Sequence, residues 1–264
     1  MMNIKRVISG ILLLLLLSIT SVIAEDLQNA DIAKRAAQPK FDERDYGTVT
    51  PVRDQGNTSL CWAYSAASAS ETSILRSGID KSVNANSLHL SPQQIGYARH
   101  NRGADPLGNT TGETTSNAWN WTNVGGGTKY AAALLSTWCG PVKSDIAYNA
   151  NGWDNAAYKL ESAIAVDGRN LNTDESAREK MKRAIVKYGA VTFSYNNVRE
   201  TDYYNPNGES GSSPHACTII GWDDTIPAKN FYPGRTVTNG GWLVKNSYSS
   251  LPYFYLFPSY FPAS

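Results

Sequence analysis

The sequence predicts an α+β protein, with helices concentrated in its first half and strands in its second. Residues 61–77 contain no proline or glycine and carry a loose apolar stripe, which predicts a helix. Residues 173–189 form the clearest amphipathic helix pattern, and a threonine or aspartate stands at its start. After residue 189 the apolar residues fall in short β-branched and aromatic runs, a pattern typical of an antiparallel, barrel-like sheet.

The remaining elements follow from local signals. Ser59 is the expected cap of the first helix, because its hydroxyl can accept a free N–H of the first turn. Ser91 and Pro92 predict the start of a second helix. A third helix is expected over residues 128–138, and strands over 190–195, 219–222, 242–244 and 253–257.

The first 24 residues predict a secretory signal peptide. Lys5 and Arg6 precede an apolar run from Ile11 to Leu17, and cleavage is expected after Ala24. A retained membrane anchor is the alternative, but the run is shorter than the ~20 residues that cross a bilayer. We therefore expect a secreted, cell-surface or periplasmic protein without membrane attachment after cleavage. Residues 25–40 are polar and alanine-rich and form a short linker or propeptide.

Charge and cysteine content exclude several classes of protein. Without the signal peptide the chain keeps 22 of its 24 basic residues and all 23 acidic ones, so no strong field favours nucleic acid or an anionic membrane. Three cysteines are too few for a disulfide scaffold. Cys139 and Cys217 could pair, but inert core thiols are the preferred interpretation. The sequence implies no metal and no organic cofactor.

Cys61 is the candidate nucleophile. It opens the predicted helix at 61–77, where the positive end of the helix dipole favours a thiolate over a thiol. His215 stands at the mouth of an apolar strand in Ser-Pro-His-Ala-Cys, and Asn246 ends another strand in Val-Lys-Asn-Ser-Tyr. Gln55 lies six residues before Cys61. His89 and His100 lack such a context; we expect them in a loop and at a solvated helix end.

These motifs, in this order, resemble those of the papain-like cysteine peptidases. The resemblance implies Cys61 as nucleophile, His215 as general base and acid, Asn246 as the group that orients the histidine, and Gln55 as an oxyanion-hole donor. It runs from about Phe41 to the end of the chain.

The resemblance also implies a fold and a substrate. Residues 41–264 would form one peptidase domain, with a helical lobe at about 53–150, a β-rich lobe at about 151–264 and a cleft between them. A polypeptide substrate would lie extended in that cleft against the backbone of Gly126 and Gly127, because only glycine lets another backbone approach so closely. We expect a monomer.

The chain departs from the family pattern at several places. Tyr248 stands where relatives carry a tryptophan that shields the Asn–His bond, and residues 249–252 replace a glycine-rich turn. Thr58 replaces a cysteine of the plant and animal relatives, and residues 25–40 are too few for the usual inhibitory propeptide. Two alternatives to a secreted endopeptidase therefore stay open: a catalytically silent surface protein that binds peptides, and a Cys–His amidase acting on cell-wall peptides.

Overall fold

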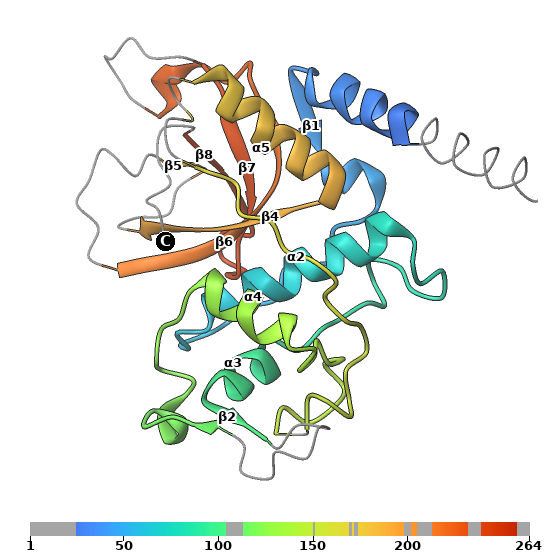
Figure 1. Ribbon diagram of the computed structural model, residues 1–264. Coiled ribbons are helices and arrows are strands. Elements are labelled where there is room, and N and C mark those ends of the chain that lie inside the picture. The colour runs from blue at the N-terminus through green and yellow to red at the C-terminus, as the bar shows by residue number, and fades with distance from the viewer. Residues whose placement is uncertain are drawn as a thin grey trace, which may run out of the picture.

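The computed structural model describes residues 25–103, 113–149, 151–168, 171, 174–197, 202–204, 213–231 and 239–257 (Figure 1). The predicted signal peptide lies outside these residues. The main helices are α2 (Cys61–Ser77), α3 (Pro92–His100), α4 (Thr128–Ser136) and α5 (Glu175–Tyr188). The strands are β1 (Lys40–Asp42), β2 (Asn101–Arg102), β3 (Glu113–Thr114), β4 (Val191–Asn197), β5 (Tyr203–Tyr204), β6 (Ser213–Asp223), β7 (Gly241–Lys245) and β8 (Tyr253–Leu256).

The helices begin and end close to the predicted residues, with one wrong cap. Helix α2 has the predicted bounds, but Leu60 precedes it without a side-chain hydrogen bond to the first turn. Ser59 instead donates its backbone N–H to the Thr122 carbonyl, so the predicted serine cap is wrong. At α3 the Ser91 hydroxyl accepts the Gln94 N–H, as predicted.

Strand β6 is the spine of the main sheet. The strand order is β1-β6-β7-β8-β5, and β4 also pairs with β6. The pairs are antiparallel except for the short parallel pair of β5 and β8. β6 has 11 residues, more than the predicted 219–222, because the polar stretch before residue 219 pairs with β4. The predicted α+β class is confirmed.

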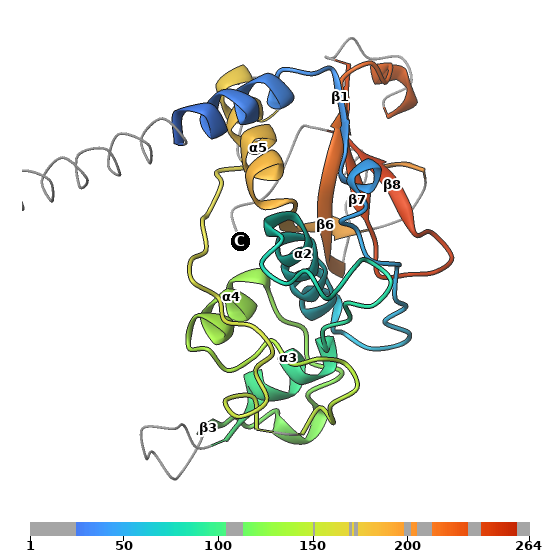
Figure 2. The same cartoon turned by 90° about the vertical axis from the view of Figure 1, so that its right-hand side faces the viewer.

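Two apolar cores lie on either side of α2. One fills the space between the sheet and α5 and includes Ile185, Cys217 and Trp242. The other lies among α2, α3 and α4 and includes Trp62 and Cys139. Figures 1 and 2 show α2 running between the sheet with α5 and the smaller helices. Cys139 and Cys217 belong to separate cores and form no disulfide with each other.

Residues 25–36 form a helix that packs on the sheet side of the molecule. Figures 1 and 2 show it beside α5. Ile32 is 7% exposed and joins the core under the sheet, and Ala36 is also buried. Arg35 pairs with Asp31 and lies over the Tyr46 ring. This segment is therefore part of the folded body.

We predict that the core contact of this helix contributes to stability. Ile32→Asp places a carboxylate among apolar side chains and should lower the free energy of unfolding by about 2–4 kcal/mol. Leu27→Asp changes the same helix at a residue that is 67% exposed, and should shift that energy by less than about 0.5 kcal/mol. Urea unfolding of the two variants measures the difference, and equal midpoints would contradict the packing.

Candidate active site

His215 and Asn246 are joined by a hydrogen bond between neighbouring strands. His215 lies in β6 and Asn246 directly follows β7; the His215 Nε2 to Asn246 Oδ1 distance is 2.9 Å. The amide is fixed, because Oδ1 also accepts the Ser247 N–H and Nδ2 donates to the Leu251 carbonyl. Since Oδ1 can only accept, Nε2 carries the hydrogen of this bond.

Two tyrosines hold the imidazole ring of His215. The Tyr248 ring stacks on it with centroids 5.2 Å apart and an interplanar angle of 16°. Tyr195 meets it edge-on at 5.7 Å. Tyr248 thus covers the histidine as the tryptophan of relatives was expected to do.

Cys61 lies beside this pair because α2 packs against β6. The Ser65 hydroxyl donates to the Cys217 carbonyl at 2.5 Å, and the Thr218 hydroxyl donates to the Ser65 carbonyl at 3.2 Å. The half-buried thiol of Cys61 accepts a hydrogen bond from the backbone N–H of Ala216, the neighbour of His215. Segments 154 residues apart in the chain, at positions 61 and 215, therefore meet at one place.

The environment of Cys61 has two opposed effects on its proton. Burial raises the pKa of the thiol, and hydrogen bonds from the backbone N–H groups of Ala216, Trp62 and Cys61 lower it. Burial is the larger effect, so the pKa lies above its ordinary value; the N–H groups of Cys61 and Trp62 at the helix start act in the expected direction but do not outweigh it. A thiolate here requires a nearby positive charge, such as an imidazolium.

The Gln55 side chain is held at both ends of its amide. Its Oε1 accepts the Ser247 hydroxyl at 2.5 Å and its Nε2 donates to the Thr58 carbonyl at 2.6 Å. The Gln55 backbone N–H also donates to the Ser247 carbonyl. An amide nitrogen carries two hydrogens, so Nε2 keeps a second one that can donate to a developing oxyanion. Sequence reasoning missed Ser247, although its position next to Asn246 was a usable signal.

A second thiol belongs to the same cluster. The Cys217 Sγ donates to Asn246 Oδ1 at 3.3 Å, so the structure brings Cys217, His215 and Asn246 together. Cys217 is 2% exposed and forms part of the core under the sheet. It approaches Asn246 from the interior of the β-rich lobe.

The two candidate glycines differ in their surroundings. A Cβ atom at Gly126 would lie 2.3 Å from the Trp62 ring, whereas one at Gly127 would meet only the Tyr130 ring at 3.9 Å. Gly127 is extended and directly precedes α4. The absence of a side chain at Gly126 therefore lets the Trp62 ring pack against the backbone. Gly127 has no such close neighbour, so a side chain there would meet open space.

Other candidate sites are not supported. His100 is buried and bonds the Thr115 hydroxyl through Nδ1, so the expectation of a solvated histidine is wrong. Among the residues that the structure describes, no three His, Cys, Asp or Glu side chains gather as metal ligands. Within the same residues no helix has the length and apolar character needed to span a bilayer.

Comparison with known sequences points to one family. Residues 37–251 match the profile described as papain family cysteine protease. Cathepsin K of Mus musculus is 26% identical over 216 residues, which are 79% of this chain and 55% of that protein. Cathepsin O of Homo sapiens is 27% identical over 216 residues, or 80% and 57% of the two chains. This chain thus spans little more than half the length of these curated relatives.

Solved structures share the fold. The cysteine protease and lectin-like domains of Cwp84, a surface layer associated protein of Clostridium difficile, match with a TM-score of 0.56 and 24% identity. That match covers 85% of this chain and 48% of the other. Digestive procathepsin L 3 of Tenebrio molitor larval midgut matches with a TM-score of 0.52 and 15% identity, over 83% and 64% of the chains.

The glycine geometry gives a prediction that does not depend on activity. Gly126→Ala forces a Cβ into the Trp62 ring and should lower the free energy of unfolding by about 1–3 kcal/mol. Gly127→Ala adds the same methyl group in open space and should change it by less than about 1 kcal/mol. Denaturant unfolding of the pair checks this, and a reversed order would overturn the assignment of Gly126 to packing.

Proposed function

Because the chain belongs to the papain family of cysteine proteases, we propose that it hydrolyses peptide bonds with Cys61 as nucleophile. In this proposal His215 is the general base and acid, Asn246 orients it, and Gln55 donates to the oxyanion. The observation that carries the proposal is the 2.9 Å bond between His215 and Asn246 beside the Cys61 thiol.

The proposed reaction begins with proton transfer from Cys61 to His215. Nε2 of the ring is engaged by Asn246, so Nδ1 takes the proton and the resulting imidazolium stabilises the thiolate. The thiolate attacks the peptide carbonyl. The resulting oxyanion accepts hydrogen bonds from the Gln55 side chain and from the backbone N–H of Cys61. His215 then protonates the leaving amine, and water attacks the thioester to release the acid.

Cys61 suits the nucleophile's role better than Cys217. A nucleophile must reach the substrate carbonyl, and Cys61 is half-buried at a helix start while Cys217 is buried in the core. The thiol hydrogen of Cys217 is directed at Asn246. We therefore assign Cys217 to the support of Asn246.

The stacked ring of Tyr248 favours an enzyme over a silent binding protein. Stacking at 5.2 Å shields the His215–Asn246 bond on one face, which is the task of the missing tryptophan. Peptide hydrolysis and cell-wall amidase activity share this chemistry, and a panel containing an unbiased peptide library and peptidoglycan fragments separates them.

Family membership supports a proposal for the substrate, and the predicted signal peptide supports one for the location. We propose a polypeptide bound in extended form along Gly127, where an added Cβ atom would meet only the Tyr130 ring at 3.9 Å. We further propose that the predicted signal peptide directs export. Cwp84, one of the structural neighbours, is described as associated with a surface layer.

The central prediction concerns the choice of thiol. Cys61→Ala should abolish peptide cleavage, because no other thiol at the site has access to substrate; a loss of at least about 10³-fold is expected. Cys217→Ala should lower kcat/KM by less than about tenfold, since it removes only a weak S–H donor. Iodoacetamide labelling mapped by mass spectrometry should show Cys61 reacting first.

Cys139→Ala is the control, because this thiol lies in the helical core, where burial raises its pKa to about 11. It should leave cleavage unchanged. Loss of cleavage in Cys217→Ala together with an active Cys61→Ala would reverse the assignment. A wild-type chain in which Cys61 labels no faster than Cys139 and no peptide is cut would leave only a binding protein.

The oxyanion role of Gln55 gives a separate prediction. Gln55→Ala removes one donor to the developing charge and should lower kcat by about 10²–10³-fold with little change in KM. Ser247→Ala leaves the amide in place but removes its anchor, so a smaller loss is expected. Steady-state kinetics on one fluorogenic peptide test both. If Gln55→Ala instead raised KM by a similar factor and left kcat unchanged, Gln55 would be assigned to substrate binding.

A further inference from the structure

Two oppositely charged side chains, Lys245 and Glu71, are buried together behind the candidate site, and the partly exposed Arg53 joins them. The Lys245 Nζ donates to the Thr50 hydroxyl at 2.9 Å, and that hydroxyl donates to Glu71 Oε2 at 2.5 Å. The other oxygen of Glu71 accepts from Arg53 Nη2 at 2.6 Å and from the Leu90 N–H at 2.7 Å. Lys245 is 4% exposed and Glu71 is 0% exposed.

The members of this cluster lie on the elements that carry the candidate residues. Lys245 is the last residue of β7, and Asn246 follows it. Glu71 lies in α2, which begins at Cys61. The cluster therefore connects the strand that ends at Asn246 with the helix that begins at Cys61.

Thr50 and Arg53 belong to the segment that leads to Gln55. Arg53 also donates from Nη1 to the Leu90 carbonyl at 2.5 Å, which ties this segment to the helical lobe. A chain of hydrogen bonds thus runs from Lys245 at the end of β7 through Thr50 to Glu71 in α2.

The cluster holds two cations and one carboxylate. Burial lowers the pKa of Lys245 to about 8; attraction to Glu71 opposes this, and repulsion from Arg53 adds to it. Tyr64 and Cys217 are the further titratable side chains along the same small cavity. Glu71 is already paired with Arg53, so burying Lys245 as a further cation is costly and calls for an explanation beyond stability.

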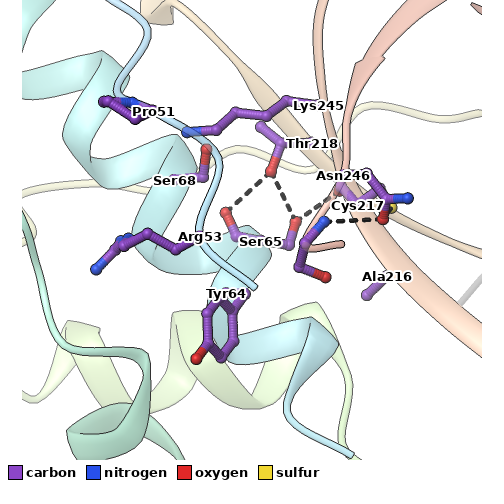
Figure 3. A pocket seen from close by; sticks show the side chains of 11 residues that line it. Pro51, Arg53, Tyr64, Ser65, Ser68, Ala216, Cys217, Thr218, Lys245 and Asn246 are labelled. Carbon is purple, nitrogen blue, oxygen red and sulfur yellow. Dashed lines mark hydrogen bonds between the residues drawn. The ribbon is translucent and has the colours of Figure 1, made fainter. Parts of the chain in front are cut away.

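The cavity beside Lys245 has a volume of about 10 Å³, which is room for about one water molecule. Figure 3 shows Lys245 reaching across it toward α2, with Ser65, Ser68 and Asn246 also on its wall. The Ser68 hydroxyl is buried and has no hydrogen-bond partner among the residues that the structure describes. Lys245 and Asn246 therefore line the same small cavity.

We propose that Lys245 is a positioning residue of the peptidase reaction: bound through Thr50 to Glu71, its ammonium group holds the end of β7, and with it Asn246, against the helix of Cys61. This inference rests on the proposed function. The variant Lys245→Met can separate this role from a structural one. It leaves Glu71 paired with Arg53 and Thr50, so no unpaired buried charge is created and the fold should persist.

The test compares Lys245→Met and Lys245→Arg with the wild type in the full chain. Lys245→Met should stay folded and lose kcat by roughly tenfold or more with little change in KM, as expected when a catalytic group is displaced slightly. Lys245→Arg keeps a charge at every pH used, so it should restore most of kcat at pH 7 and keep activity above pH 8 where the wild type declines. Lys182→Met, which removes the partner of Asp224, is the matched control and should behave as wild type.

The protonation of Lys245 can be followed without activity. Folded Lys245 releases its proton near pH 8 and the unfolded chain near pH 10.5. The stability of the wild type should therefore rise relative to Lys245→Met between these values, because the unfolded state binds the extra proton there.

Nuclear magnetic resonance of the His215 ring decides the coupling. In the wild type the ring signals should shift near pH 8, as Lys245 loses its charge, and this shift should be absent from Lys245→Met. Identical curves in the two proteins, or wild-type kcat and pH profile in folded Lys245→Met, would overturn the inference. A wild type that cuts no peptide and has an unreactive Cys61 would instead refute the proposed function, while the ring titration would still test Lys245.

Discussion

The candidate site depends on the packing of helix α2 against strand β6. The hydroxyls of Ser65 and Thr218 connect the two elements at 2.5 and 3.2 Å, and this contact sets the start of the helix beside the middle of the strand. Because a helix and a strand are rigid, the contact fixes where Cys61 stands relative to His215. The Ala216 N–H at the Cys61 thiol is the direct result.

A second set of contacts joins the segment before Cys61 to the segment after Asn246. Segment 54–55 is bound to segment 247–249: the Gln55 amide by Ser247, and the Asp54 carboxylate by the N–H and hydroxyl of Ser249. Ser249 lies in the segment that stands where a glycine-rich turn was expected. Hydrogen bonds from Ser249 and Gly56 lower the pKa of Asp54, so this carboxylate stays ionised and able to accept them in mildly acidic solution.

The site also illustrates how burial and charge are balanced. Burial disfavours the charged form of both Cys61 and Lys245. For Cys61 the compensation we propose is an imidazolium that forms with the thiolate, so the charge appears only as a pair. For Lys245 it is the carboxylate of Glu71, reached through a hydroxyl. In both pairs one group lies in α2 and the other in a strand of the main sheet.

The sequence by itself determined the main helices, the longer strands and the order of the chemical groups. Local signals found α2 with its bounds and the serine cap of α3, and four separated motifs indicated the family that residues 37–251 match. These properties depend on neighbouring residues or on residue types, which the sequence displays directly.

Only the tertiary structure decided how these groups meet. The burial that raises the pKa of Cys61, the stacking of Tyr248 on His215 and the link from Lys245 to Glu71 join residues far apart in the chain. The packing of residues 25–36 on the sheet was equally hidden. An alanine-rich polar segment is typical of a linker, and only the tertiary structure shows that its Ile32 is buried in the core. Long-range packing sets such contacts, and no local pattern encodes them.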